Sequence, residues 1–318
     1  MLLIEHGIIK ANSNSGDFDT VTFFDLDEQR VAQTRKVVPN AVGFPARFEK
    51  VMTVMPRAAP SNRIDDEDRA ARDDERFRSI QQDFFEKFPF DVINLDLCGH
   101  VFKPSDQFPG QVVNAMRRVF ELQRSDLIHA GSNRGPIDGF TLMFTTEIGP
   151  TNLDTAHLDQ LEKCLQDNLE EDTNLVALLA ERAGTSCVKE IRDSSRDLFF
   201  EISVPKLVLR YLHEEDWVVE KERGIHVYKF DRPAGASKPA YSMLHFVAHI
   251  TRQMPSRLHR AGVPSASTKE SYSSVVTKLF ARKPVEVTEA QVELERAEIG
   301  ESLKKIDELA SQFKASLT

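Results

Sequence analysis

Acidic side chains end two apolar stretches of the sequence. Asp25 and Asp27 lie at the end of TVTFFDLD, and Asp96 lies near the end of FDVINLDL. A carboxylate at the end of a buried strand presents two acceptor oxygens in a fixed position, which suits the hydroxyl or amino groups of a ligand. The positions of these acidic residues have a second explanation, which is that each core strand reaches water there. The residues alone leave both interpretations open.

Two further candidates follow Asp96 in the stretch DLCGH. Gly99 lets the backbone approach a ligand closely, and His100 is a candidate proton acceptor beside it. His245 and His249, in HFVAH, would lie about 13 Å apart on a strand, which is too far to bind one metal ion. We therefore expect these two histidines to be structural, and the sequence predicts no metal site.

The elements that position these residues alternate between strands and helices. Strands are predicted at residues 20–27, 41–48, 91–97 and 139–149, and helices between them at residues 27–38, 69–88 and 110–123. This alternation favours an α/β fold with a mostly parallel sheet and flanking helices. Ligands in such sheets bind beyond the carboxyl ends of the strands, where the acidic residues lie.

The rest of the chain predicts three further parts. Helices at residues 151–182 and 204–216 precede two hairpin-like strands, 217–232 and 239–250, which add an antiparallel hairpin at the sheet edge and complete a domain over residues 1–250. Residues 251–287 combine scattered Lys and Arg with Ser and Pro, which predicts a basic linker. Residues 288–318 open with the capping pattern TEAQ and repeat apolar residues every seven positions, which predicts a C-terminal helix.

Composition restricts the class of protein. The formal charge of −9 argues against a polyanion-binding surface over the whole chain, although a local basic patch remains compatible with nucleic acid. The three cysteines match neither a disulfide framework nor a zinc knuckle, which indicates a reducing compartment. No apolar run approaches the length of about 18 residues that a membrane span needs. We expect a cytoplasmic protein without a membrane partner.

The stretches VTFFDLDEQRV and FDVINLDLCG resemble two signature strands of class I S-adenosylmethionine-dependent methyltransferases, which have a Rossmann-like fold. In that family an acidic residue ends the second strand, and a D-P-P-Y or D-P-[FY]-G motif ends the fourth. The resemblance covers roughly residues 18–150. It implies a methyltransferase-like protein that acts on or binds nucleic acid or a nucleotide-like ligand.

The resemblance also implies a cofactor, S-adenosylmethionine, and residues that would hold it. Asp25 or Asp27 would accept hydrogen bonds from the ribose hydroxyls. Arg47 and Glu49 would lie near the adenine edge, and Gly99 would let the backbone come close to the ligand.

On the substrate side, the resemblance implies that Asp96 holds the amine to be methylated, with His100 beside it. The sequence departs from the family pattern at two places. Residues 1–19 contain no G-x-G-x-G motif, and Leu97 and Cys98 stand where the family has proline and an aromatic residue.

These departures keep two alternatives open. One is a catalytically inactive methyltransferase-fold subunit that works by protein interaction, as a homo- or hetero-oligomer through the C-terminal helix. The other is a metal-dependent enzyme acting on nucleotides, because carboxylates at strand ends also suit magnesium. In the methyltransferase hypothesis, the basic residues 251–283 are the candidate contact with nucleic acid.

Overall fold

The computed structural model describes residues 21–37, 41–53, 67–97, 100–101, 111–125, 137–148, 153, 155–220, 224–232, 241–253 and 271–288, with the single positions 291, 297 and 301. The chain divides into two compact units, Met1–Pro45 with Val287–Thr318, and Ala46–Glu286. This division differs from the expected single domain over residues 1–250, because the first two strands belong to a unit of their own.

The first unit contains a short strand–helix–strand motif. Strands β1 (Thr22–Asp25) and β2 (Val42–Pro45) pair in parallel, with helix α2 (Glu28–Val37) between them in sequence. Gly43 allows close packing here, because a β-carbon at this position would lie 2.5 Å from the ring of Phe23 and 2.7 Å from Val31. The glycine thus admits side chains of β1 and α2 and is part of the packing of this motif.

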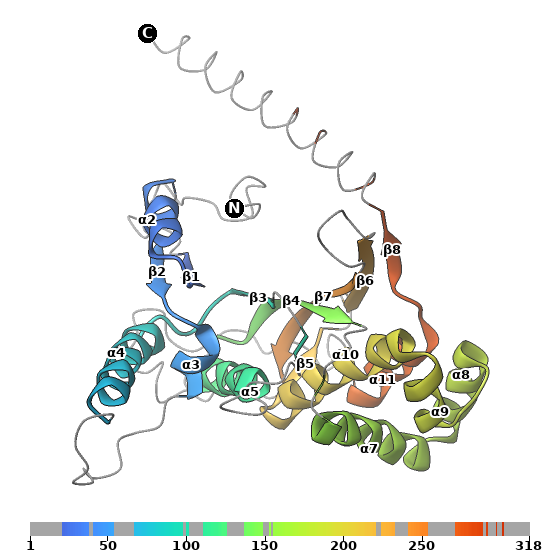
Figure 1. Ribbon diagram of the computed structural model, residues 1–318. Helices are drawn as coiled ribbons and strands as arrows, with labels where there is room; N and C mark the ends of the chain where they lie inside the picture. The colour runs from blue at the N-terminus through green and yellow to red at the C-terminus, as the bar shows by residue number, and fades with distance from the viewer. Residues whose placement is uncertain are drawn as a thin grey trace. The chain divides into compact units, whose positions relative to one another are not determined.

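The second unit is built on a six-stranded sheet with the order β3-β4-β7-β6-β8, and β5 also pairs with β7 (Figure 1). The strands are β3 (Val92–Asp96), β4 (Gly139–Ile148), β5 (Trp217–Val219), β6 (Ile225–Arg232), β7 (Tyr241–Arg252) and β8 (Val285–Val287). Strand β3 runs parallel to β4, whereas β7 runs antiparallel to β4, β5 and β6. The sheet is therefore mixed. The predicted α/β class is confirmed. The predicted antiparallel pair is present as β6 and β7, but it lies between β4 and β8 in the strand order and not at the sheet edge.

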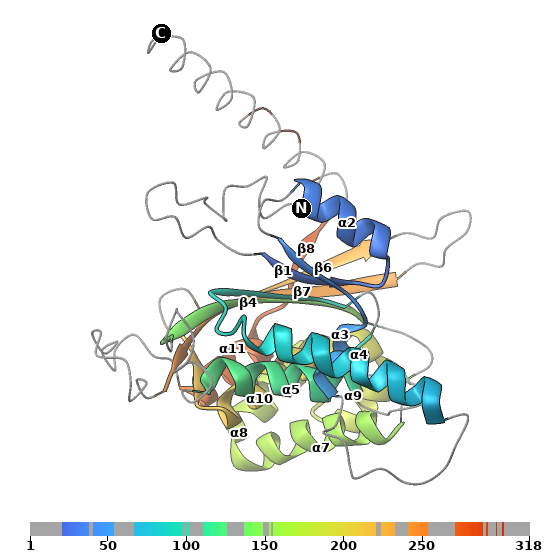
Figure 2. The same cartoon turned by 90° about the vertical axis from the view of Figure 1, so that its left-hand side faces the viewer.

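The helices of the second unit gather on one face of this sheet (Figure 2). Alternate residues of β4 are buried, and β3 alternates between exposed and buried positions, as expected for strands with one covered face. Helix α10 contributes the most buried residues to this helical layer, since its residues between Phe199 and Leu212 are almost all buried. The helices are α3 (Phe48–Thr53), α4 (Glu67–Phe85), α5 (Gln111–Arg124), α7 (Thr155–Glu171), α8 (Thr173–Ala183), α9 (Val188–Ser194), α10 (Arg196–Glu214) and α11 (Tyr272–Ala281).

A buried ion network ties this helical layer to the sheet. Arg182 of α8 and Lys229 of β6 both contact the carboxylate of Glu201 on α10, at 3.1 and 3.2 Å. Arg182 also donates to the backbone carbonyl of Leu279 on α11, at 2.6 Å. Burial lowers the pKa of Arg182 despite the nearby Glu201. Glu201 is the partner that both cations share, so loss of Glu201 would leave the buried Arg182 without its carboxylate.

The predicted linker over residues 251–287 is only partly correct. Residues 272–281 form α11, which buries Val275, Val276, Leu279 and Phe280. Arg252, at the end of β7, is also buried, since its guanidinium lies 5.1 Å from the Trp217 ring centroid and donates to the carbonyls of Ile137 and Arg124. Apolar residues at helical spacing between the basic ones explain why part of this segment packs. Arg257, Arg260 and Lys269 lie outside the described residues.

The start of the predicted C-terminal helix has the expected cap. The backbone N–H of Thr288 donates to the side-chain oxygen of Gln291 at 2.8 Å, and the N–H of Gln291 donates to the Thr288 hydroxyl at 3.3 Å. This reciprocal pair is a capping box. The apolar repeat of residues 292–317 lies outside the described residues. None of the helices that the structure describes is long and apolar enough to cross a membrane.

The strand that carries Asp96 is held at its entrance by a buried glutamine. Gln123 of α5 accepts a hydrogen bond from the N–H of Phe90 and donates to its carbonyl, both at 2.7 Å. Its amide therefore pairs with the backbone as a neighbouring strand would. The Phe90 ring packs with those of Phe84 and Phe88, with centroids 5.8 and 4.8 Å away.

We expect Gln123→Leu to lower the free energy of unfolding by about 2 kcal/mol, because it leaves two partly buried backbone groups without their partners. Urea unfolding followed by circular dichroism measures this change. The matched control is Gln82→Leu on the exposed side of α4, for which we expect a change within about 0.5 kcal/mol. Equal effects of the two substitutions would contradict the role of the Gln123 amide.

Candidate functional site

Asp96 is the last residue of β3, and its side chain is exposed on the face of the sheet opposite the helices. The N–H of Leu97 donates to the carbonyl of Thr145 at 3.0 Å, so the parallel pairing continues one residue past Asp96. Helix α5 connects β3 to β4, as in the parallel crossover expected from sequence. The structure thus places Asp96 at the carboxyl end of a parallel strand, where ligands of α/β proteins bind.

The strand register aligns Asp96 with three polar residues from three neighbouring strands. Asp96 pairs with Thr145 of β4, Thr145 with His245 of β7, and His245 with Tyr228 of β6. Directly paired residues lie on the same face of a sheet. We call these four residues the polar row.

Hydrogen bonding and ring contacts hold the polar row together. The Thr145 hydroxyl lies 2.7 Å from Nδ1 of His245, and the Tyr228 ring lies 6.2 Å from the imidazole, centroid to centroid. Burial lowers the pKa of His245, and the negative charge of Asp96 acts in the opposite direction. His245 is therefore neutral at pH 7, and its pKa depends on the charge of Asp96.

His249 forms a second pair of the same kind. Its Nδ1 lies 3.0 Å from the hydroxyl of Thr141, the β4 residue that pairs with both His249 and Val92. His245 and His249 both lie on β7, and on a strand this spacing is too wide for the two imidazoles to bind one metal ion. Among the described residues, no group of three or more His, Cys, Asp or Glu side chains could hold a metal ion. The β3 residue of this second row is Val92, and the N–H of Glu220, which follows β5, donates to the carbonyl of His249 at 2.8 Å.

Asp25 and Asp27, the acidic residues expected to hold the cofactor, have different roles. Oδ1 of Asp27 accepts the backbone N–H groups of Gln29 and Arg30, at 2.8 and 3.3 Å, and Oδ2 lies 3.6 Å from Nε of Arg30. Asp27 is therefore the N-terminal cap of α2. Asp25 is half-buried at the carboxyl end of β1 and accepts the N–H of Asp27 at Oδ1, at 2.9 Å. Of the two, Asp25 fits a ribose better because its second oxygen makes none of these capping bonds.

The other predicted cofactor residues lie near the start of α3 or outside the described residues. The backbone carbonyl of Arg47 accepts the N–H groups of Lys50 and Val51, both at 3.1 Å, and the Arg47 side chain is exposed. Glu49 lies in the first turn of α3. Both belong to the second unit, whereas Asp25 belongs to the first. Gly99 lies outside the described residues.

His100 lies in the interior and differs from the expected ligand-facing position. Only 3% of its surface is exposed, and its ring packs edge-to-face on Phe200 of α10 with centroids 4.6 Å apart. Burial lowers its pKa to about 3. A histidine in an apolar interior is kept neutral, so its observed role is packing between the end of β3 and α10.

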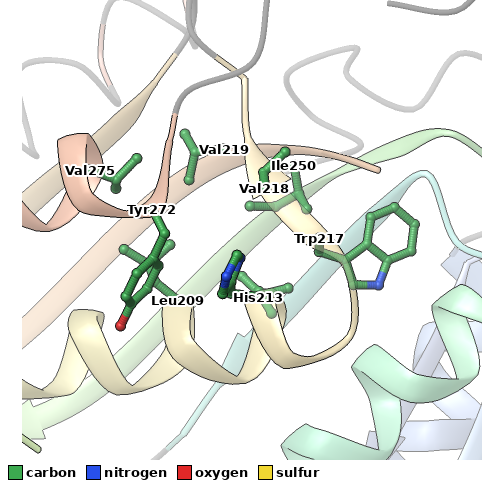
Figure 3. Close-up of a pocket in the computed structure, with 9 residues that line it drawn as sticks. Leu209, His213, Trp217, Val218, Val219, Ile250, Tyr272 and Val275 are labelled. Carbon is green, nitrogen blue, oxygen red and sulfur yellow. The ribbon is translucent and has the colours of Figure 1, made fainter. Parts of the chain in front are cut away.

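A small apolar hollow lies on the helix-covered side of the sheet (Figure 3). Residues of α10, β5, β7 and α11 line it, and the rings of His213 and Tyr272 stack there with centroids 5.0 Å apart. Its interior has room for about one water molecule, far less than a nucleotide needs. It is a packing defect of the core and does not contain the polar row.

Sequence reasoning found Asp96 but missed its partners. Thr141 and Thr145 are four residues apart on β4, as are His245 and His249 on β7. The available signal was that the threonine pair and the histidine pair have the same spacing on two predicted strands. It could not be used without the register, because a shift of one residue moves every side chain to the other face.

Comparison with known proteins places part of the chain in a family model. Residues 76–217, which are under half of the 318 residues, match a family described as PP_RS20740-like, and this description names no activity. No curated protein and no solved structure matches the chain. The matched residues include Asp96 and Thr145 and end before β6 and β7, which carry Tyr228 and His245.

We expect Asp96→Asn to lower the pKa of His245 further, because the substitution removes the charge that raises it. Histidine-selective NMR across a pH titration measures this shift. Asp91→Asn, at the other end of the same strand, is the control and should leave the His245 pKa unchanged. An unchanged His245 pKa in Asp96→Asn would contradict the coupling.

We also expect His100 to make stability depend on pH. Its folded pKa of about 3 lies below the ordinary histidine value of 6.5, so its stabilisation is complete above pH 6.5 and is lost as the pH falls from there toward 3. The loss approaches about 1.4 kcal/mol per pH unit. In His100→Phe this part of the slope should vanish in urea unfolding measured between pH 6.5 and pH 4. Parallel pH profiles of the two proteins would contradict a neutral, buried His100.

Proposed function

We propose that this chain is a divergent class I methyltransferase-like protein that binds a nucleotide-like ligand at the carboxyl end of β3. The observation that carries the proposal is the position of Asp96. It is an exposed carboxylate at the end of a parallel strand, in a row with a hydroxyl, a neutral imidazole and an aromatic ring. This arrangement offers hydrogen-bond acceptors and a flat apolar surface, which are the features that recognise a base or a nucleoside.

Asp25 is the residue that we assign to the cofactor ribose. It is half-buried at the end of β1 and uses Oδ1 for the turn to Asp27, so we assign Oδ2 as the acceptor for a ribose hydroxyl. S-adenosylmethionine supplies an activated methyl group when it is bound. The Rossmann-like arrangement remains part of this proposal, supported by the parallel crossovers β1–α2–β2 and β3–α5–β4.

The partner assignments also remain proposals. A nucleic-acid contact through residues 251–283 now depends on fewer cations, because Arg252 is buried against Trp217. An oligomer through the C-terminal helix is supported by its capping box at Thr288 and Gln291 and by the apolar repeat in the sequence.

Calorimetric titration with S-adenosylmethionine and with S-adenosylhomocysteine tests the proposal. We expect binding by the wild-type protein and at least about tenfold weaker binding by Asp25→Asn, since a hydrogen bond to a charged group contributes about 1.5–3 kcal/mol. Asp27→Asn should keep the affinity, because asparagine caps a helix as well as aspartate does.

Absence of heat and of thermal stabilisation with both compounds would overturn the cofactor assignment. The inactive-subunit alternative then becomes the leading hypothesis. The same titrations repeated with added magnesium, and with magnesium alone, test the metal-dependent alternative.

A further inference from the structure

The chain returns to the interior shortly after the exposed carboxylate of Asp96. Leu97 continues the pairing with β4, since its N–H donates to the carbonyl of Thr145 at 3.0 Å. A few residues further on, His100 is 3% exposed and Val101 is 1% exposed. Asp96, by contrast, is exposed at the end of β3. The chain therefore passes from the edge of the sheet into the core directly beyond the candidate ligand residue.

Two contacts hold this returning segment in the core. The N–H of Val101 donates to the hydroxyl of Thr146 at 3.1 Å, and Thr146 is fully buried. The ring of His100 packs edge-to-face on Phe200, with centroids 4.6 Å apart. Burial lowers the pKa of His100 to about 3, so an uncharged ring makes this contact at pH 7. The first contact reaches β4, and the second reaches α10.

Both points of attachment lie on closely packed elements of the second unit. Thr146 belongs to β4, the strand that pairs with both β3 and β7. Phe200 is fully buried in α10, and the next residue, Glu201, carries the buried ion network. Elements packed in this way hold a neighbouring backbone in one position, which a ligand site needs before the ligand arrives.

We propose that His100 and Thr146 are positioning residues for the ligand site at the carboxyl end of β3. Both side chains face the core, so neither contacts the ligand. Each fixes the backbone that follows Asp96, so that the carboxylate keeps one position relative to β4 and to His245, whose pKa it influences. The inference rests on the proposed ligand at this edge and adds the residues that hold the edge ready for it.

Hydrogen exchange of backbone amides, measured by NMR on the full-length protein, tests this inference. In the wild-type protein we expect the amides of Leu97 and Val101 to be protected about as well as those in the core of β4. Thr146→Val removes the acceptor of the Val101 N–H with little change of shape, so both amides should exchange at least about tenfold faster. Thr251→Val is the matched control, because it removes a buried hydroxyl that donates to the Asp138 carbonyl at the other end of the sheet. It should leave both rates unchanged.

The ring contact is tested by His100→Ala and His100→Phe. His100→Ala removes the ring from Phe200, so we expect faster exchange of the Val101 amide and a shifted titration of His245, because Asp96 is no longer fixed. His100→Phe keeps an aromatic ring at this position and should restore both. A purely structural loss would instead speed the exchange of all core amides alike and leave the His245 titration unchanged.

Calorimetric titration with S-adenosylmethionine separates this inference from the proposed function. Thr146→Val should bind at least about tenfold more weakly than the wild-type protein, and Thr251→Val should bind equally well. Faster exchange of the two amides with unchanged affinity overturns the positioning role and leaves the proposed function intact. If the wild-type protein does not bind, the proposed cofactor is overturned, while the exchange rates and the His245 titration still decide whether His100 and Thr146 fix this edge.

Three further outcomes would each overturn the inference. The first is a wild-type Val101 amide that exchanges as fast as an exposed amide. The second is equal exchange rates in Thr146→Val and Thr251→Val, and the third is a failure of His100→Phe to restore what His100→Ala loses. The first of these needs no variant, so the test holds even where a variant fails to fold.

Discussion

One-sided burial of the six-stranded sheet is the constraint on which the rest of the second unit depends. Helices cover one face, and β3 and β4 alternate strictly between buried and more exposed residues. Phe144 and Phe246, whose ring centroids lie 5.2 Å apart, are fully buried beneath the helices, while their sequence neighbours Thr145 and His245 lie on the opposite face. A slip of one residue would bury the polar groups and expose the rings. The hydrophobic core therefore fixes which side chains are able to meet a ligand.

Charged groups reinforce this arrangement on the helix-covered side. Lys229 of β6 reaches Glu201 of α10, and although burial opposes its charge, the hydrogen bond to Glu201 raises its pKa above the usual value. Arg182 joins the same carboxylate from α8 and also holds the end of α11 through the Leu279 carbonyl. Such a network contributes little net stability compared with an apolar core, but it tolerates only one relative position of the elements that it joins. It thereby helps to keep β6, and with it Tyr228, in register.

Much of the architecture was predictable because it is encoded in local periodicity. The strands at 22–25, 92–96 and 139–148 and the helix α5 were expected within a few residues, and so was the Thr288–Gln291 cap. Helix α11 was missed because the basic, serine and proline residues on both sides of it suggested a linker, although Val275, Val276, Leu279 and Phe280 have helical spacing. The prediction that His100 faces a ligand was wrong. A histidine that follows a strand is expected at the surface, whereas here its ring packs on Phe200 in the interior.

By itself, the sequence determined the α/β class, the acidic ends of β1 and β3 and the resemblance that these ends carry, since each depends on residues close together in the chain. Only the tertiary structure decided that Asp96 aligns with Thr145, His245 and Tyr228, residues up to about 150 positions away. The reason is physical. Pairing between distant strands depends on how the whole sheet buries its apolar face, and no local pattern specifies that register.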